Sequence, residues 1–483
     1  MLDALTIVVP GLAGLAAFVI PRNRPRRIML VAAAVAHLAL TLATFAGRSR
    51  PMFDGALLLD APGRIFLLAT SVLFFAAALY AVGYLDRETR GQRPDMVEGG
   101  LFSNSPEARF TGCLLLFLGA MSFVCMAANL GLLWVGVEAT TLASAPLIYF
   151  HRHHRSLEAT WKYLLLCSVG IALALFGTYM LALAGGGEVS LHLSALMAAG
   201  PSLDPMLLKA AFVFLLVGYG TKMGLAPMHT WLPDVYSESP SLVALMSTCL
   251  LNVSFLAILR VRQVLSAAGQ AQFAGDLLVA LGLASMAWAA VFLLRQTDYK
   301  RLLAYSSVEH MGILAFGAGI GGAGMHGSLL HMLAHGAAKG AMFLLAGNVL
   351  ALYLTKEVSG VRGAVRALPW SGPLWVAGVL ALTGMPPFGT FVSELAILRA
   401  ALAGPRPLLA GAYLLLIAMA FIGITTAAFR MAQGHGAQPR QAERMSACWP
   451  PLVLMLCVLL LGLWHPEPLA DMLAASARIT GGF

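Results

Sequence analysis

Apolar runs about as long as a membrane is thick recur along the whole chain, and they restrict the fold more than any other feature. A transmembrane α-helix needs roughly 20 consecutive apolar residues. Of the 483 residues, 59% are hydrophobic and 11% are charged, and the mean hydropathy is +0.81. These values exclude an ordinary soluble globular protein. The sequence therefore predicts an all-α polytopic membrane protein.

Dividing the apolar runs by length gives about fourteen transmembrane helices. The first run has no basic region before it and no small-residue cleavage site after it, so we expect a retained helix rather than a cleaved signal. The predicted helices cover about 3–20, 28–46, 65–84, 111–127, 130–150, 160–184, 207–227, 241–261, 274–294, 303–323, 326–354, 371–400, 408–430 and 448–464.

Arginine and lysine are distributed unevenly between the loops. Loops that follow odd-numbered helices hold most of them, as in Arg22–Arg27 and Arg295–Arg301, whereas the long loop 185–205 has none. The positive-inside rule then places the odd loops in the cytoplasm and both termini outside. Because the basic residues lie in these loops, the net charge of +9 does not indicate nucleic-acid binding. The six cysteines lack metal-type spacing and are expected to be packing residues.

The stretch from Tyr219 to Asp234 interrupts one of the predicted helices. It contains Lys222, followed by Gly224, Pro227 and Pro233. Each proline removes a backbone donor, and irregular backbone at membrane depth survives only inside protein or beside a cavity. A lysine next to a broken membrane helix marks a functional site. The alternative is a lysine that extends its charge from a helix end to the membrane surface.

The same interruption occurs a second time. Gly224–Trp231 and Gly384–Phe391 both follow the pattern Gly-x-x-Pro-x-x-Thr-aromatic. Lys222 precedes the first copy and Glu394 follows the second. The copies fall in the seventh and twelfth predicted helices, and this odd spacing gives them opposite orientations, as in inverted-repeat transporters.

Further ionisable residues lie within the apolar runs. Glu138 has no charged neighbour in its own helix, so we expect a cation on another helix, or else a protonated structural glutamic acid. His331, His335 and Lys339 step by four residues and share one helix face. This stripe suits a proton relay. His-x-x-x-His is also zinc-ligand spacing, but the third member is a lysine and no glutamate follows His331, so we predict no metal.

Glu309 and His310 follow the predicted cytoplasmic loop 298–301 closely. They are interpreted as a proton entrance, or alternatively as an ordinary interfacial pair. No nucleophile elbow, Walker loop, dinucleotide fingerprint or cysteine cluster accompanies Glu138, Lys222, Lys339 or Glu394. Alternating acids and bases without catalytic machinery favour proton movement over bond chemistry, so no catalytic residue is predicted.

These residues resemble the antiporter-like membrane subunits of respiratory complex I, Mrp cation/proton antiporters and membrane-bound nickel–iron hydrogenases. The resemblance runs from roughly Thr111 to Arg430. Within this family, Ser239–Asn252 and Ser306–Gly312 are most similar to hydrogenase-4 component F of formate-hydrogenlyase-type assemblies. The segments that carry the wider resemblance are Glu138, Lys222 with Pro227–Asp234, Asp298–Ser306, His331–Lys339 and Pro386–Glu394.

The resemblance implies two inverted five-helix repeats, each with a broken helix. The expected division is 1–110 (first three helices and a cytoplasmic loop), 111–262 (first repeat), 263–432 (second repeat) and 433–483 (last helix and tail). Glu138 and Lys222 would form a coupling ion pair, Lys339 the central relay and Glu394 the exit. His229, His331 and His335 would connect them.

The chain departs from many complex I relatives in the eighth helix. It has Met246 and Ser247 where those relatives have lysine or histidine, with Asn252 further along. Either water bridges this gap or the path is interrupted there.

The resemblance also implies partners and a location. The chain would be a non-catalytic proton-channel subunit in a bacterial inner membrane, without a cofactor of its own. Nickel–iron and iron–sulfur centres would lie only in partner subunits that form a peripheral hydrogenase-like arm. The alternatives are an Mrp-type sodium/proton antiporter subunit, an antiporter-like partner of an inorganic-carbon uptake complex, and a membrane metalloenzyme built on His331 and His335.

Overall fold

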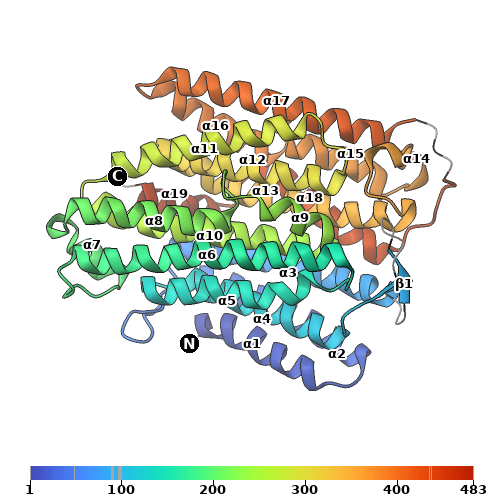
Figure 1. Ribbon diagram of the computed structural model, residues 1–483, viewed down its shortest axis with the longest axis horizontal. Coiled ribbons are helices and arrows are strands. Elements are labelled where there is room, and N and C mark those ends of the chain that lie inside the picture. The colour runs from blue at the N-terminus through green and yellow to red at the C-terminus, as the bar shows by residue number, and fades with distance from the viewer. Residues whose placement is uncertain are drawn as a thin grey trace.

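The computed structural model describes residues 2–47, 49–88, 92–95, 101–434, 436 and 438–481. Most of these residues are helical, and the long helices lie side by side in one bundle (Figure 1). One two-stranded antiparallel sheet joins β1 (Gln92–Pro94) to β2 (Leu101–Ser103) in the loop between the third and fourth helices. The prediction of an all-α polytopic fold is confirmed.

The helices follow one another with short connections. They are α1 (Leu2–Val19), α2 (Asn23–Ala46), α3 (Ala61–Arg87), α4 (Glu107–Met126), α5 (Leu130–Ile148), α6 (His154–Ala184), α7 (Leu193–Ala198), α8 (Pro205–Met223), α9 (Trp231–Glu238), α10 (Ser241–Ala267), α11 (Ala271–Leu293), α12 (Tyr299–Ile320), α13 (Ala323–Tyr353), α14 (Ala364–Ala367), α15 (Ser371–Leu382), α16 (Gly389–Ala403), α17 (Pro407–Ala432), α18 (Met445–Leu463) and α19 (Glu467–Gly481).

Twelve helices among the described residues are long and apolar enough to cross a membrane. They include α8 but not α12, α15 or α16. The count of fourteen therefore requires α12 and the pair α15/α16 to be spans as well, and it stays a prediction. The inverted orientation of the repeats and the four proposed segments of the chain also stay predictions.

Helices α10 and α13 form the centre of the bundle. Both are buried along their apolar length and contact each other. Helix α1 lies at one edge and α17 at the opposite edge (Figure 1). Their outward faces carry exposed apolar side chains such as Leu12, Leu15, Leu414 and Leu415. Lipid tails are as apolar as leucine, so these faces suit a membrane and do not need a protein cover.

Both predicted helix breaks are present. Helix α8 ends before Gly224 (φ +81°) and α15 ends just before Gly384 (φ +63°). These left-handed backbone conformations favour glycine. Each break also contains a cis X-Pro bond, Ala226-Pro227 in the first and Pro386-Pro387 in the second. The Gly-x-x-Pro pattern therefore marks a helix break with a positive-φ glycine and a cis proline at both positions.

Two predictions about the helix ends are wrong. Helix α10 does not end near residue 261, where the sequence predicts a loop that begins with Arg260 and Arg262, but extends to Ala267, so both arginines lie inside a buried helix. Arg260 forms an ion pair with Asp60 (Nη1 to Oδ2, 3.0 Å), which allows its burial. The predicted C-terminal tail contains α19, because Leu469, Leu473 and Ala477 recur at helical spacing and bury one face.

Candidate functional site

The first charged cluster lies where α5, α6 and α8 meet. We define it as Glu138, Thr141, Tyr163 and Lys222. The Lys222 ammonium is fully buried and donates to the hydroxyls of Thr141 and Tyr163, at 3.1 Å for the latter. Its Nζ also lies 5.0 Å from the centroid of the Tyr163 ring. A cation over an aromatic face gains electrostatic stabilisation that partly offsets the cost of burial.

Glu138 and Lys222 do not form the direct ion pair that the sequence predicts. The Thr141 hydroxyl lies between them, accepting from Lys222 Nζ and donating to Glu138 Oε2 at 3.0 Å. A hydroxyl can do both at once because it carries one hydrogen and two lone pairs. Glu138 is half-buried, whereas Lys222 is wholly enclosed. The two charges are therefore joined through one neutral group.

The second charged cluster lies where α12, α13 and α16 meet. We define it as Ser306, Glu309, His310, His331, His335, Lys339, Ser393 and Glu394. All eight side chains are buried. The three imidazoles pack as a group, with ring centroids 5.1–5.6 Å apart. The predicted stripe on α13 thus meets titratable groups from two other helices.

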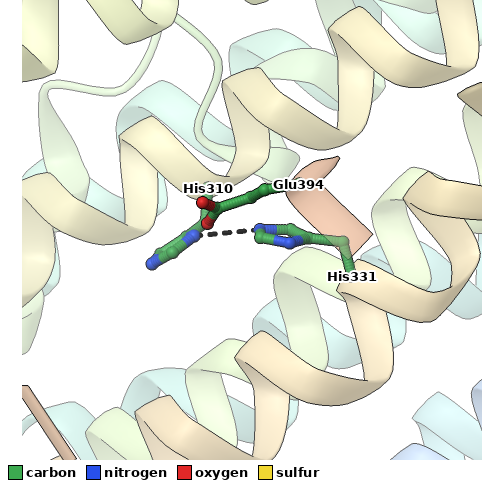
Figure 2. Close-up of side chains that lie close together, drawn as sticks. All are labelled: His310, His331 and Glu394. Atoms are coloured by element: carbon green, nitrogen blue, oxygen red, sulfur yellow. Dashed lines mark hydrogen bonds between the residues drawn. The ribbon is translucent and has the colours of Figure 1, made fainter. Parts of the chain in front are cut away.

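A chain of hydrogen bonds connects these helices. His310 Nδ1 lies 3.0 Å from His331 Nε2, and His331 Nδ1 lies 2.9 Å from Ser393 Oγ. Ser393 Oγ donates in turn to the Thr390 carbonyl at 2.8 Å. Figure 2 shows His310, His331 and Glu394 pointing toward one another. Their ligand-type atoms all lie within 4.8 Å of one another.

The direction of this chain follows from its end. The Ser393 hydrogen is used on the Thr390 carbonyl, so Ser393 must accept from His331 Nδ1. Neutral His331 then has an unprotonated Nε2, which accepts from His310 Nδ1. The protonated nitrogen of each ring therefore points toward Ser393. His310 Nε2 is left buried with no partner among the described residues, ready to accept a proton.

Lys339 stands one helical turn from His335. Its ammonium donates to the Leu303 carbonyl at 2.7 Å and to the Ser306 hydroxyl. His335 Nδ1 donates to the His331 carbonyl at 3.1 Å, so its Nε2 carries the lone pair and has no described partner. The row of titratable side chains therefore begins with the Lys339 cation and continues with two unprotonated nitrogen atoms, Nε2 of His335 and Nε2 of His310.

Glu394 is held by the second helix break. A Cβ built on Gly384 would lie 2.1 Å from Glu394 Oε2, so the carboxylate packs directly against the glycine backbone. Gly384 is required there twice, for its positive φ and for this close approach. Met385, Pro386 and Pro387 in the same break are exposed on the bundle surface. The break therefore places Glu394 next to the surface of the bundle.

Glu309 and His310 lie deep in the bundle and not at a loop surface. Glu309 is 4% exposed and its Oε2 has no hydrogen-bond partner among the described residues. His310 is fully buried and bonded to His331. This position does not suit an entrance, and it makes both residues members of the interior row.

Helix α10 separates the two clusters. Ser247 donates to its own helix, at the Val243 carbonyl (3.0 Å), and so offers no hydrogen to a neighbour. Asn252 faces α13 instead, since a Cβ built on Gly336 would lie 3.4 Å from Asn252 Nδ2. Both amide atoms of Asn252 are buried without a described partner. Asn252 is thus the polar group that α10 offers to the second cluster.

His229 is not brought into either cluster by a hydrogen bond between described residues. It lies in the first break, where its ring packs 5.7 Å from Trp288 and 6.3 Å from Tyr305 between centroids. Its Nδ1 is buried without a described partner. A connecting role for His229 stays a prediction.

The loop end of α9 is anchored by charge pairs. Asp234 bonds to Lys162 (2.9 Å) and to Arg301, and Glu238 bonds to Lys356 (2.9 Å). Burial lowers the pKa of His153 beside this group, although Glu238 lies 3.9 Å away and acts in the opposite direction. These pairs fix α9, and with it the first break.

A metal ion is one alternative use of His310, His331 and Glu394, because two imidazoles and a carboxylate are zinc-type ligands. A metal would need an unprotonated nitrogen on each ring aimed at one point. In the chain traced above, His310 Nδ1 carries the hydrogen that it donates to His331. The described geometry therefore favours a hydrogen-bonded relay.

Sequence reasoning missed the neutral members of both clusters. Thr141, Tyr163, Ser306 and Ser393 carry the bonds that connect the charged groups. Serine and threonine are common in membrane helices, so composition gives no signal for them. Spacing gives a weak one, since Thr141 lies three residues after Glu138 and Ser393 directly precedes Glu394.

Comparison with known proteins shows one family. The model described as NADH:quinone oxidoreductase/Mrp antiporter, transmembrane, matches residues 127–420. That range contains every ionisable group of the two clusters. The match agrees with the extent of the resemblance drawn from the motifs.

Relatives and solved structures agree with this match. The chain is 40% identical to a hydrogenase-4 component F homolog from Methylacidiphilum infernorum over 73% of this chain and 74% of the relative. It is 31% identical to NADH-quinone oxidoreductase subunit N from Desulforudis audaxviator, over 68% of this chain and 63% of the relative. A chain of respiratory complex I from Thermus thermophilus superposes with a TM-score of 0.83, at 25% identity and over 100% of both chains.

Proposed function

The chain belongs to the NADH:quinone oxidoreductase/Mrp antiporter transmembrane family, and from that premise we propose that it moves protons across a membrane within a redox-driven complex. Hydrogenase-type assemblies are the favoured context, because the 40% identical relative is a hydrogenase-4 component F homolog. The proposed location is a bacterial inner membrane, with both termini on the outer side, as the distribution of arginines predicts.

The observation that carries the proposal is the row of buried ionisable side chains from Lys339 to Glu394, in which His310, His331 and Ser393 are joined by hydrogen bonds. It combines a cation, three imidazoles and a carboxylate, all buried, with hydrogen bonds that cross from α12 to α13 and α16. Buried histidines, lysines and carboxylates of this kind mark proton relays in membranes. A structural core would not need three titratable rings in contact.

The proposed transfer uses the ring tautomers traced above. A proton that reaches His310 Nε2 makes the ring cationic, and the Nδ1 hydrogen can then pass to His331 Nε2. His331 releases its Nδ1 hydrogen toward Ser393 and the neighbouring Glu394 carboxylate. The rings end in the opposite tautomers and must reset before the next proton. Lys339 supplies the proton at the start of the row.

The first cluster is proposed as the coupling element. Lys222 and Glu138 share Thr141, so a shift of α8 or α5 that breaks either bond changes the electrostatic field at Lys222. A lysine that loses a nearby carboxylate releases its proton more readily. The driving reaction would act on this cluster through partner subunits, where the nickel–iron and iron–sulfur centres are expected. No cofactor is proposed for this chain.

The main alternative is a sodium/proton antiporter subunit, because the matching family includes Mrp antiporters. Hard cations bind to several oxygen ligands. In the described second cluster, the imidazoles of His310 and His331 lie between Lys339 and the carboxylate of Glu394, so the oxygen ligands are not gathered around one point. This donor set favours protons over sodium as the carried ion.

One purification tests the proposal. The chain, tagged at one end, would be extracted from its native membrane in a mild detergent, and the accompanying subunits identified by mass spectrometry. A nickel–iron subunit with iron–sulfur partners supports the hydrogenase context. A set of small membrane subunits without any redox centre, together with sodium-dependent transport in vesicles, would instead establish the antiporter alternative.

A further inference from the structure

A cavity of about 780 Å³ opens where α11 and α17 end, beside the loop 294–298. Three arginines line it: Arg295 after α11, Arg362 before α14 and Arg430 in the last turn of α17. No acidic residue is among the described residues that line it. The volume lies in the range of small-ligand sites, roughly 300–1,000 Å³.

Several other arginines of the described structure are neutralised by carboxylates. Arg27, Arg260 and Arg301 each pair with a carboxylate. The guanidinium groups of Arg295, Arg362 and Arg430 form no ion pair or hydrogen bond with another described residue. Three unneutralised cations around one cavity repel one another and favour a bound anion.

The rest of the cavity wall combines neutral polar side chains with an apolar side. The polar ones are Gln296, Thr297, Ser359, Thr426 and Gln433. Leu293, Leu294, Ala427 and Phe429 form the apolar side, and α11 and α17 close the floor of the cavity where Gly423 packs on the Leu293 backbone. A Cβ built on Gly423 would lie 2.8 Å from the Leu293 carbonyl carbon. The wall continues onto the outer faces of both helices, where Val291 is 61% and Ile422 is 55% exposed.

The cavity is thus cationic at its mouth and apolar toward the middle of the helices. We propose that it binds the phosphate of an anionic glycerophospholipid such as phosphatidylglycerol, with an acyl chain lying along α11 and α17. Guanidinium groups match phosphate oxygens in planar, two-pronged hydrogen bonds. Basic pockets between membrane helices are a recurring site for anionic headgroups.

A free phosphate ion would leave the apolar wall unused. An acidic protein segment would match the charge but not the lipid-facing faces of α11 and α17. In the predicted orientation the three arginines face the cytoplasmic leaflet. The inference does not depend on the proposed proton path, because none of the lining residues belongs to either charged cluster.

The test compares two triple variants of the full chain, purified in neutral detergent with its native partner subunits. One is R295Q/R362Q/R430Q. The control is R22Q/R24Q/R109Q, which removes the same charge from exposed arginines outside the cavity. The measured quantity is the thermal unfolding midpoint as palmitoyl-oleoyl phosphatidylglycerol, phosphatidylcholine with the same chains, or inorganic phosphate is added.

We expect phosphatidylglycerol to raise the midpoint of the wild-type and control proteins saturably, with half-saturation about 100-fold higher in R295Q/R362Q/R430Q, since each arginine near a membrane surface contributes roughly fivefold. Phosphatidylcholine and inorganic phosphate should have little effect. If the triple variant is poorly folded, the single glutamine variants replace it in the test. Each of them changes only one exposed side chain and should raise the half-saturation concentration about fivefold.

Three results would overturn the proposal. The first is equal response of the cavity variant and the control to phosphatidylglycerol. The second is an equal rise with inorganic phosphate, which would make the cavity a free-anion site. The third is a cross-link from Arg362→Cys to an acidic partner subunit in the purified complex, with no lipid effect, which would make it a protein interface.

Discussion

The two charged clusters solve the same problem of buried charge in different ways. In the first cluster, Lys222 and Glu138 are joined through a single hydroxyl of Thr141, and one aromatic ring covers the lysine. In the second, Lys339 begins a row of three imidazoles that ends at Ser393 and Glu394. The first is compact and has two charged members, whereas the second extends across three helices.

The breaks beside the clusters differ as well. In the first break, Ser285 accepts from the Ala226 backbone at 2.9 Å, and Trp231 donates to the Thr221 carbonyl at 2.8 Å, so the freed backbone groups are satisfied inside the bundle. The second break holds the carboxylate of Glu394 against Gly384 and exposes three consecutive residues, Met385 to Pro387, whereas the first break exposes only Pro227 and Thr230 among its residues 224–230. A compact pair with an enclosed lysine suits a switch, and an extended row that ends near the surface suits conduction.

Replacing either lysine should have the largest effect, because each cluster has only one. We expect Lys222→Met and Lys339→Ala to lower proton translocation in proteoliposomes about 100-fold or more, the scale of losing a positioned proton donor. Lys209→Met, in the same helix as Lys222 but facing Phe273, is the control and should transport normally. Transport near the wild-type rate in Lys222→Met would remove the first cluster from the mechanism.

Substitutions of the three imidazoles should lower the transport rate by different amounts. His331 bonds through both ring nitrogens to groups on other helices, whereas His335 bonds only to a carbonyl of its own helix. His331→Ala should therefore cost about tenfold in rate and His335→Ala only about threefold, since water can replace one neutral group. The measurement is the initial rate of vesicle acidification.

The variant His331→Ala also distinguishes a proton relay from a metal site. Metal content of the purified wild-type protein should be well below one ion per chain, and His331→Ala should not change it. A tightly bound zinc or iron ion that is lost on His331→Ala would contradict the relay and support coordination by His310, His331 and Glu394 instead.

Thr141→Val tests the compact cluster with the smallest expected change. Valine keeps the shape but removes the hydroxyl between Lys222 and Glu138, so coupling should weaken about threefold, the worth of one hydrogen bond. Thr140→Val is the matched control, because its hydroxyl donates only to the Val137 carbonyl of the same helix. Equal rates in the two variants would show that Thr141 does not connect the charges.

Helix periodicity and backbone chemistry explain which features the sequence predicts correctly. The stripe His331–His335–Lys339 follows from four-residue spacing on one helix, and both breaks follow from Gly-x-x-Pro. The contact of His310 with His331 depends on how α12 rotates against α13, which no local pattern specifies. The same holds for Arg260, whose partner Asp60 lies far away in sequence and lets a charged residue stay inside α10.

The burial of Glu309 and His310 shows the limit of arguing from loop proximity. The sequence predicts an entrance because Glu309 and His310 follow a basic loop by only a few residues. A helix rises about 1.5 Å per residue, however, and His310 lies far enough from the start of α12 at Tyr299 to be well inside the bundle. Depth in a membrane helix therefore has to be counted from the helix start. Sequence reasoning missed Thr141 for a different reason, because a neutral hydroxyl does not stand out in an apolar run as a charged side chain does.

Proton release at Glu394 tests the central claim most directly. Glu394→Gln keeps the side-chain shape against Gly384 and removes the titrating group, and the measurement is redox-driven proton translocation by the reconstituted complex. We predict that Glu394→Gln shows no translocation above the passive leak, while Glu394→Asp retains part of it. Wild-type translocation by Glu394→Gln, with its redox partners present and active, would contradict a path that runs from Lys339 to Glu394.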